Sequence, residues 1–423
     1  MNPKALLPIL LGGALGAAGL LQGLQWKNAA ATGRSEEMAA ELQTLREEIE
    51  LLERENESLR SLAQGGGELS VPPTLIEFAE SVIGLDFRSS PMVHQVAGEE
   101  LADRITAAIE SRFPPNSLDH RQQAWSAIGL LNPNDRYAAQ LAVTRSLGAR
   151  SWFDDQTGEA WVTDRFDTNS IPDQAALLRA LARILLHQHY PPPAGYLGDD
   201  ADRARTALHH GAAMAVENRF LARQALGRGF TGSMDDGGAS RELLASLPVF
   251  IRGLATFPSQ LGLPRANRLM EQEELLGTLH EPPVLTATYF PDQEDLEITL
   301  PVLPEQAGEQ VLQESLGMLG LQLWLATLDP EWADLATAWR GDRFTLQARS
   351  DTQLDLLWHV QLADEASATR ILEAARTMIG VIAGLDEDPA AGEFTATPDG
   401  RRMQVEQIGP TLIQFRNLGP GDE

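Results

Sequence analysis

The chain has 423 residues, of which 43% are hydrophobic, so it is long enough to form two or three domains with sizeable cores. Its formal net charge of −27 argues against a nucleic-acid partner, because phosphate binding requires a basic surface. It contains no cysteine, which excludes disulfides, thiol catalysis and cysteine-ligated metals.

Residues 1–34 contain an almost uninterrupted apolar run from residue 5 to residue 24. Lys4 precedes this run, and a segment of this length can span a bilayer. We therefore predict a transmembrane anchor that places the protein in the inner membrane as a single-pass protein, with its body in the periplasm or at the cell exterior. A cleaved signal peptide is the alternative, because three alanines at residues 29–31 suit signal peptidase.

Residues 35–63 have the spacing of a coiled coil, with apolar residues three and four positions apart in alternation. Asn56 occupies a core position, where paired amides favour a parallel two-stranded coil. We predict a homodimer through this segment, and the alternative is a single stalk helix that packs on its own domain. The predicted dimer interface comprises Leu42, Leu45, Ile49, Leu52, Asn56 and Leu59. Residues 64–73, rich in glycine and proline, are predicted to be a linker.

Residues 74–281 are expected to form a mainly helical body, which begins with helices near 74–83 and 99–111. A β-hairpin is predicted to follow. Its two strands contain aromatic and β-branched residues, at 152–153 and 160–162, on either side of a turn.

The clearest helix signal in the body is the segment from Asp173 to Tyr190. Its leucines recur at helical spacing, and Asp173 occupies the expected N-cap position. Arg179, Arg183 and His187 follow one another at intervals of four residues, so they are expected to share one face of this helix.

Residues 282–423 are expected to form a small α+β part. Helices are predicted near 314–328 and 363–382, and strands at 343–348, 355–361, 403–408 and 412–415. The chain as a whole is therefore predicted to be α+β. It contains no P-loop, dinucleotide-binding fingerprint or serine-nucleophile elbow.

The chain resembles a bacterial family of zincin-type metallopeptidases, whose active-site helix reads HExxHALxDQxF. Arg179 and Arg183 fall on the two histidines of that motif, and Ala180 falls on its glutamate. On the next helix His210 falls where the family has a glutamate as its third metal ligand. Further segments that match the family, in the same order, are 150–158, 257–262, 282–286 and 336–343.

The resemblance implies a zincin-like body, with the hairpin at the rim of its cleft, but without the family's chemistry. Arginine does not ligate zinc and alanine does not accept a proton, so we expect no catalytic residue and no cofactor. We therefore predict a pseudopeptidase that binds or scaffolds a protein or peptide partner. Two alternatives stay open: a hydrolase with a rearranged metal site at His187 and His210, and a purely structural dimeric stalk protein.

Two interpretations of Arg179 and Arg183 also stay open. Arginines four residues apart are typical of a solvated helix face. If they instead fill the former metal pocket, they need carboxylate partners, because a buried guanidinium is costly without one. The expected partners are Asp199, Asp200 and Asp202.

Overall fold

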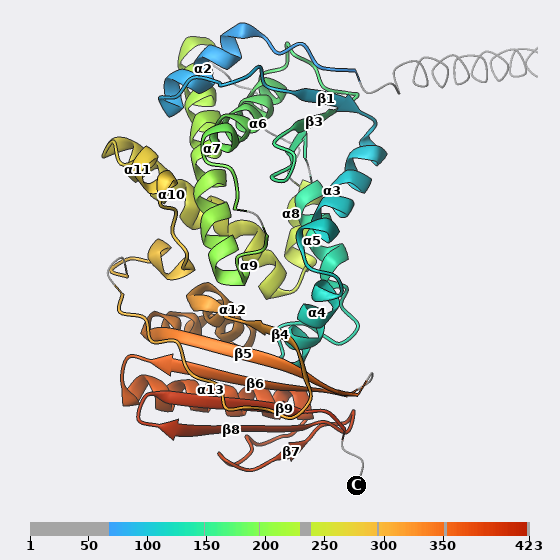
Figure 1. Ribbon diagram of the computed structural model, residues 1–423, viewed down its shortest axis with the longest axis vertical. Helices are drawn as coiled ribbons and strands as arrows, with labels where there is room; N and C mark the ends of the chain where they lie inside the picture. Colours follow the sequence, from blue (N-terminus) through green and yellow to red (C-terminus); the bar gives the residue numbers. More distant parts are fainter. Residues whose placement is uncertain are drawn as a thin grey trace, which may run out of the picture. The chain divides into compact units, whose positions relative to one another are not determined.

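The protein is described by a computed structural model, shown in Figure 1, over residues 67–147, 149–193, 195–228, 238–293, 296–350 and 353–420. The described part is α+β, with a helical part followed by a six-stranded sheet. Residues 1–66 lie outside the described residues. They include the predicted anchor, the predicted coiled coil and residues 64–66 of the predicted linker. The homodimer therefore stays a prediction.

The prediction of a membrane-spanning fold has to be corrected. Within the described ranges, none of the helices combines the length and the apolar character needed to cross a bilayer. Neither the predicted transmembrane helix nor the single-pass inner-membrane location is supported. The segment on which they were based, residues 5–24, lies outside the described residues.

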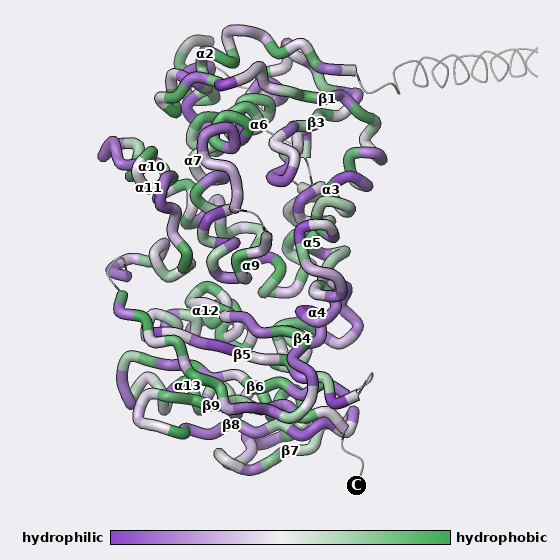
Figure 2. The backbone as a smooth tube through the Cα atoms, viewed as in Figure 1, coloured by the Kyte–Doolittle hydropathy of each residue, from purple (hydrophilic) through white to green (hydrophobic). Residues whose placement is uncertain are grey.

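The helical part follows the predicted pattern of a body dominated by helices, with α6 at its centre. Its helices are α2 (Pro73–Ile83), α3 (Gly98–Arg112), α4 (Ser117–Ala127), α5 (Tyr137–Ser146), α6 (Ile171–His189), α7 (Asp199–Arg228), α8 (Gly238–Ser246), α9 (Val249–Phe257), α10 (Leu263–Glu271) and α11 (Leu275–His280). Apolar residues are concentrated along α6, as Figure 2 shows, because this helix is covered by α2, α7 and the hairpin.

The N-terminus of α6 differs from the prediction in one detail. Ser170, not Asp173, is the N-cap, and its hydroxyl accepts a hydrogen bond from the backbone N–H of Asp173. Asp173 lies in the first turn, where its carboxylate accepts from the N–H of Asp167 at 3.1 Å and pairs with Arg150 at 2.6 Å. These contacts fix the loop that connects the hairpin to α6.

A small sheet lies beside α6. It consists of β1 (Val93–Val96), β3 (Ala160–Thr163) and β2 (Ser151–Phe153), in that order across the sheet. The antiparallel pair of β2 and β3 is the predicted hairpin. The parallel pairing of β1 with β3 was not predicted, because it joins segments more than sixty residues apart.

Two glycines bring α7 unusually close to the segment before α10. A Cβ on Gly211 would lie 2.3 Å from the carbonyl oxygen of Gly262, and a Cβ on Gly262 would lie 2.4 Å from that of Ala207. Gly262 belongs to a π-helical turn, η2 (Pro258–Gly262). The close contact between the two backbones excludes any residue larger than glycine at either position.

The C-terminal part is an antiparallel sheet with two main helices. Across the sheet the strands are β4 (Glu309–Glu314), β5 (Trp339–Ser350), β6 (Gln353–Leu362), β9 (Leu412–Leu418), β8 (Arg402–Gly409) and β7 (Thr395–Ala396). Helix α12 (Gly317–Leu328) packs on β5, and α13 (Glu365–Ala383) packs on β6, β8 and β9 (Figure 1). Two 3-10 segments, η3 (Thr286–Tyr289) and η4 (Pro330–Ala338), flank α12.

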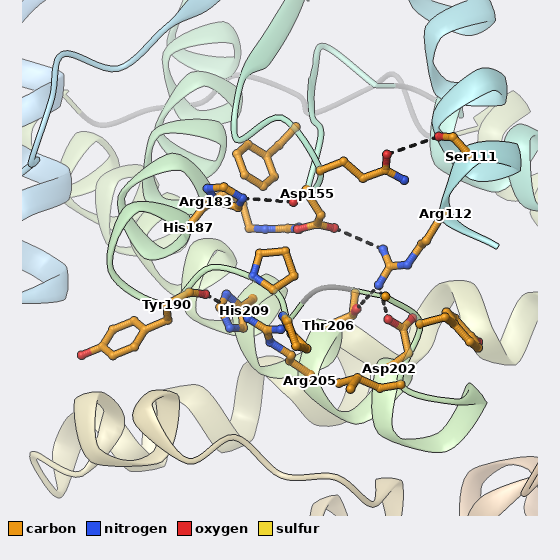
Figure 3. A pocket seen from close by; sticks show the side chains of 17 residues that line it. Ser111, Arg112, Asp155, Arg183, His187, Tyr190, Asp202, Arg205, Thr206 and His209 are labelled. Carbon is orange, nitrogen blue, oxygen red and sulfur yellow. Dashed lines mark hydrogen bonds and ion pairs between the residues drawn. The ribbon is translucent and has the colours of Figure 1, made fainter. Parts of the chain in front are cut away.

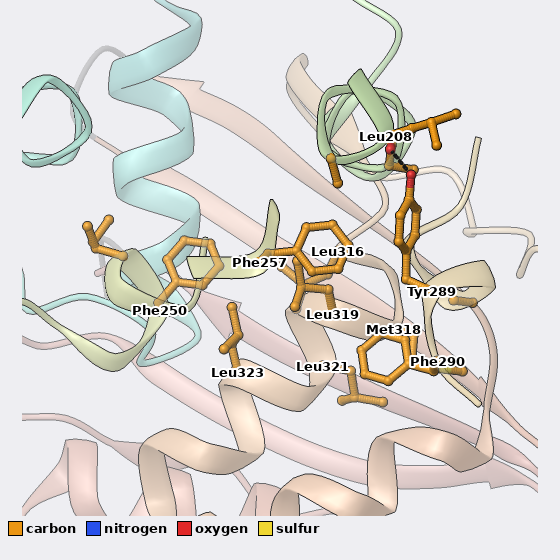
Figure 4. Close-up of a cluster of buried hydrophobic side chains, with 14 of the residues drawn as sticks. Leu208, Phe250, Phe257, Tyr289, Phe290, Leu316, Met318, Leu319, Leu321 and Leu323 are labelled. Atoms are coloured by element: carbon orange, nitrogen blue, oxygen red, sulfur yellow. Dashed lines mark hydrogen bonds between the residues drawn. The ribbon is translucent and has the colours of Figure 1, made fainter. Parts of the chain in front are cut away.

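The helical part and the sheet share one hydrophobic core. Figure 4 shows where α7, α9 and α12 meet. Phe257 of α9 packs edge-on against Tyr289, with 5.2 Å between the ring centroids. Nearby, the indole of Trp125 contacts the rings of Phe250 and Phe344, so it links α4 to both α9 and β5. This continuous core holds α6 and α7 in place and so positions the cleft described next.

Candidate functional site

A cleft of about 410 Å³ lies between α3, the β2–β3 hairpin, α6 and α7 (Figure 3). The hairpin, expected at the rim of the cleft, contributes Phe153, Asp155 and Gln156. The loop from α6 to α7 closes another side with prolines and tyrosines. The charged side chains that line the cleft are Arg112, Asp155, Arg183, Asp202 and Arg205.

Arg183 of α6 is buried in the wall of this cleft, and only 5% of its surface is exposed. Its guanidinium donates to the carboxylate of Asp155 and lies over the ring of Phe153, 4.9 Å from the centroid. Asp155 also pairs with Arg112 at 3.4 Å. Although burial opposes ionisation of Asp155, Arg183 and Arg112 hold the pKa of its carboxyl group well below the ordinary value. The two arginines and this aspartate therefore form a charged network along the cleft.

Arg179 does not belong to the cleft. Its side chain is 45% exposed and pairs with Glu217 of α7, with Nε 2.7 Å from the carboxylate. Ala180, the next residue of α6, is buried. The two arginines therefore differ: Arg179 is on a solvated face, and Arg183 is buried in the cleft wall with an acidic partner.

The predicted partners of these arginines were wrong. Asp202 lines the cleft, but it pairs with Arg112. Asp199 is buried against Arg121, with 2.9 Å between Nε and the carboxylate. Asp200 accepts from the N–H and the hydroxyl of Thr286, at 3.1 and 2.5 Å. The first turn of α7 thus directs two of its three aspartates toward the rest of the core.

The histidines around the cleft are held in different ways. His187 lines it, and its Nε2 lies 3.1 Å from the carbonyl oxygen of Asp155. His189 points elsewhere, toward the carbonyl oxygen of Asp86 at 2.8 Å. Burial, together with the charge of Arg183, lowers the pKa of His210 well below the ordinary value. His210 is not among the residues that line the cleft.

Of the predicted alternative metal pair, His187 lines the cleft and His210 does not. Among the residues that the structure describes, no three or more histidine, aspartate or glutamate side chains are grouped so that they could hold a metal ion.

His209 is the most deeply buried histidine of the cleft, with 8% of its surface exposed. Its Nε2 has no hydrogen-bond partner among the described residues. Burial, with the charges of Arg183 and Arg205, lowers the pKa of His209 to about 3 from its ordinary value of 6.5. The ring is therefore neutral in the folded protein at neutral pH.

We expect His209 to make the protein less stable in mild acid. Between pH 3 and 6.5 the unfolded chain binds a proton that the folded chain does not, so the free energy of unfolding rises with pH in this window. At pH 5 this histidine should cost about 2 kcal/mol relative to pH 7. Urea denaturation at both pH values should show that His209→Gln removes this difference. His280→Gln, at an exposed position on α11, should retain it. Equal pH dependence of wild type and His209→Gln would contradict the prediction.

Sequence reasoning did not find several of the cleft residues. Arg112 and Asp155 are brought together from α3 and the hairpin turn, and no local pattern connects them. Arg205 and His209 are four residues apart on α7, so their shared face was visible in the sequence. The missing information was which face of α7 borders the cleft.

Comparison of the chain with protein-family models, with curated proteins and with solved structures found no match.

Proposed function

We propose that this protein is a pseudopeptidase: a body related to the zincin-type metallopeptidases, whose cleft binds a peptide without cleaving it. The observation that carries the proposal is the ion pair between Arg183 and Asp155 in the cleft wall. The resemblance assigns the position of Arg183 to a zinc-ligating histidine. A guanidinium has no lone pair for a metal and repels cations, so this position now stabilises a carboxylate instead.

The absence of a proton acceptor at position 180 supports the same proposal. In the resembling family a glutamate there acts as general base, whereas Ala180 is buried and has no polar side-chain atom. Both carboxylates that line the cleft are engaged in ion pairs, since Asp155 pairs with Arg183 and Asp202 pairs with Arg112. Such paired groups suit recognition of a ligand better than proton transfer.

A peptide is the ligand that fits the cleft best. The volume of the cleft, about 410 Å³, is within the range of sites for small ligands, roughly 300 to 1,000 Å³. Phe153, which lines the cleft, belongs to β2, and β2 is an edge strand of its sheet. Edge strands offer backbone groups to extended peptides. Prolines and tyrosines of the α6–α7 loop supply apolar surface for side chains.

Binding without cleavage is tested by incubating the purified full chain with a mixture of synthetic peptides and analysing bound and free fractions by mass spectrometry. We expect saturable enrichment of intact peptides and no new termini. Leu197 lines the cleft and is 46% exposed, so Leu197→Asp should reduce enrichment by about tenfold without unfolding the protein. Leu226, on α7 and 90% exposed, lies outside the cleft, and Leu226→Asp should bind like wild type.

Two results would contradict this proposal. Cleaved peptides that disappear with Leu197→Asp would identify a hydrolase that uses this cleft. Enrichment that both leucine variants retain would place peptide binding elsewhere on the protein.

A further inference from the structure

The charges that line the cleft do not balance. Three arginines, but only two carboxylates, are among the lining residues. Asp202 pairs with Arg112, and Asp155 pairs with both Arg112 and Arg183. Arg205 instead donates to the backbone carbonyl of Tyr190 at 2.9 Å and forms no ion pair with any other described residue. One positive charge is therefore left for a ligand, in a chain whose net charge is −27.

A second group beside Arg205 also lacks a partner. His209 follows Arg205 by one turn of α7, so the two side chains lie on the same face of the helix, next to each other in Figure 3. The buried Nε2 of His209 forms no hydrogen bond to the described residues, although the ring borders the cleft. An unsatisfied buried nitrogen is costly, and a ligand oxygen would satisfy it. A neutral imidazole with its proton on Nε2 supplies the donor.

Apolar side chains line the same cleft as these two residues. They include Phe153 and the prolines Pro192 and Pro193. A ligand that matches this arrangement has an anionic oxygen pair for Arg205 and His209 and an apolar group immediately beside it. A planar carboxylate meets a guanidinium through two parallel hydrogen bonds, which also fixes the orientation of the ligand.

We propose that the cleft binds a peptide by its C-terminal carboxylate, which Arg205 and His209 hold while the last side chain lies against Phe153, Pro192 and Pro193. This inference rests on the proposed function and specifies which end of the peptide is recognised. Capture of a chain terminus by converging donors is a known mode of peptide recognition. A free carboxylic acid has the same recognised group, so the experiment has to separate the two sources.

The test is isothermal titration of the full chain with N-acetyl-Leu-Phe and with its C-terminal amide, which differ only in charge at the recognised group. The acid should bind at least about tenfold more tightly than the amide, because a hydrogen-bonded charge is lost in the amide. In Arg205→Met the preference should fall to less than about threefold, and in Arg205→Lys it should be intermediate. Arg179→Met is the matched control, since Arg179 is exposed and outside the cleft, and it should keep the preference of wild type.

Several outcomes would overturn the inference. Equal binding of acid and amide by wild type would exclude a carboxylate site, a result that does not depend on whether any variant folds. The inference would also be overturned if neither probe binds at millimolar concentration. It would likewise be overturned if Arg205→Met, with an unchanged melting temperature, keeps the wild-type preference for the acid over the amide. Binding of 3-phenylpropionate as tight as that of the dipeptide would assign the site to free acids and overturn the peptide assignment. Equal binding leaves the proposed function standing, whereas cleavage of the peptide would refute that function instead.

Discussion

Replacement of Asp342 with alanine is expected to lower the free energy of unfolding by about 4 kcal/mol. Asp342 is buried at the start of β5 and is the acceptor at the centre of a hydrogen-bond network. Its carboxylate accepts from the backbone N–H groups of Leu316 and Gly317, at 2.8 and 2.9 Å, where α12 begins. It also accepts from the indole N–H groups of Trp339 and Trp358, at 3.0 and 2.9 Å.

Alanine would leave these four donors buried without an acceptor. Each buried unsatisfied donor costs about 1–3 kcal/mol, and the helix also loses a negative charge at its N-terminus. Urea denaturation followed by tryptophan fluorescence measures the loss. Asp334→Ala, at an exposed position of η4, should change the stability by less than about 0.5 kcal/mol. A loss below about 1 kcal/mol for Asp342→Ala would mean that the network does not stabilise the fold.

This network explains the residues of segment 336–343 in structural terms. Trp339 and Asp342 belong to it directly. Gly341 between them is required because a Cβ there would lie 2.3 Å from the carbonyl oxygen of Thr299. The motif therefore holds α12 against the sheet, far along the chain from the cleft residues, and its residues have a structural role.

The second large effect is expected for Arg183. Arg183→Ala should lower the free energy of unfolding by about 3 kcal/mol, because it removes a buried partner of Asp155 and exposes the ring of Phe153. The value lies at the low end for buried pairs, since Asp155 keeps Arg112. Arg179→Ala, which breaks the exposed pair with Glu217, should cost at most about 1 kcal/mol.

Chemical denaturation of the two alanine variants measures both losses of unfolding free energy. The pH dependence of the loss for Arg183→Ala provides a further test. The lowered pKa of Asp155 means that its stabilising contribution is present above the ordinary aspartate pKa and is lost as pH falls below it. The stability difference between wild type and Arg183→Ala should therefore shrink in acid. Equal losses for Arg179→Ala and Arg183→Ala at neutral pH would contradict the different environments of the two side chains.

Local patterns in the sequence were sufficient for several elements around the site. The leucine spacing of residues 173–190 predicted α6, and the aromatic residues on either side of a turn predicted the β2–β3 hairpin. The helices near 314–328 and 363–382 correspond to α12 and α13. Each of these depends on residues a few positions apart, so hydrophobic periodicity and turn chemistry are enough to specify it.

Local sequence patterns did not predict strand β4 or the register of the C-terminal sheet. The sequence of β4, EQVLQE, has few apolar residues, because β4 is an edge strand in which only Leu312 is buried. Its pairing with β5 depends on chain segments that only the folded sheet brings together.

The sequence by itself determined the helix that carries Arg179 and Arg183, and it determined that neither side chain can ligate a metal. Only the tertiary structure decided that Arg183 faces Asp155 while Arg179 faces solvent, and that Arg205 and His209 border the same cleft as Phe153. The reason is physical. A residue's chemistry and its helical phase are local properties, whereas its burial, its charge partner and its pKa depend on which distant elements pack against that face.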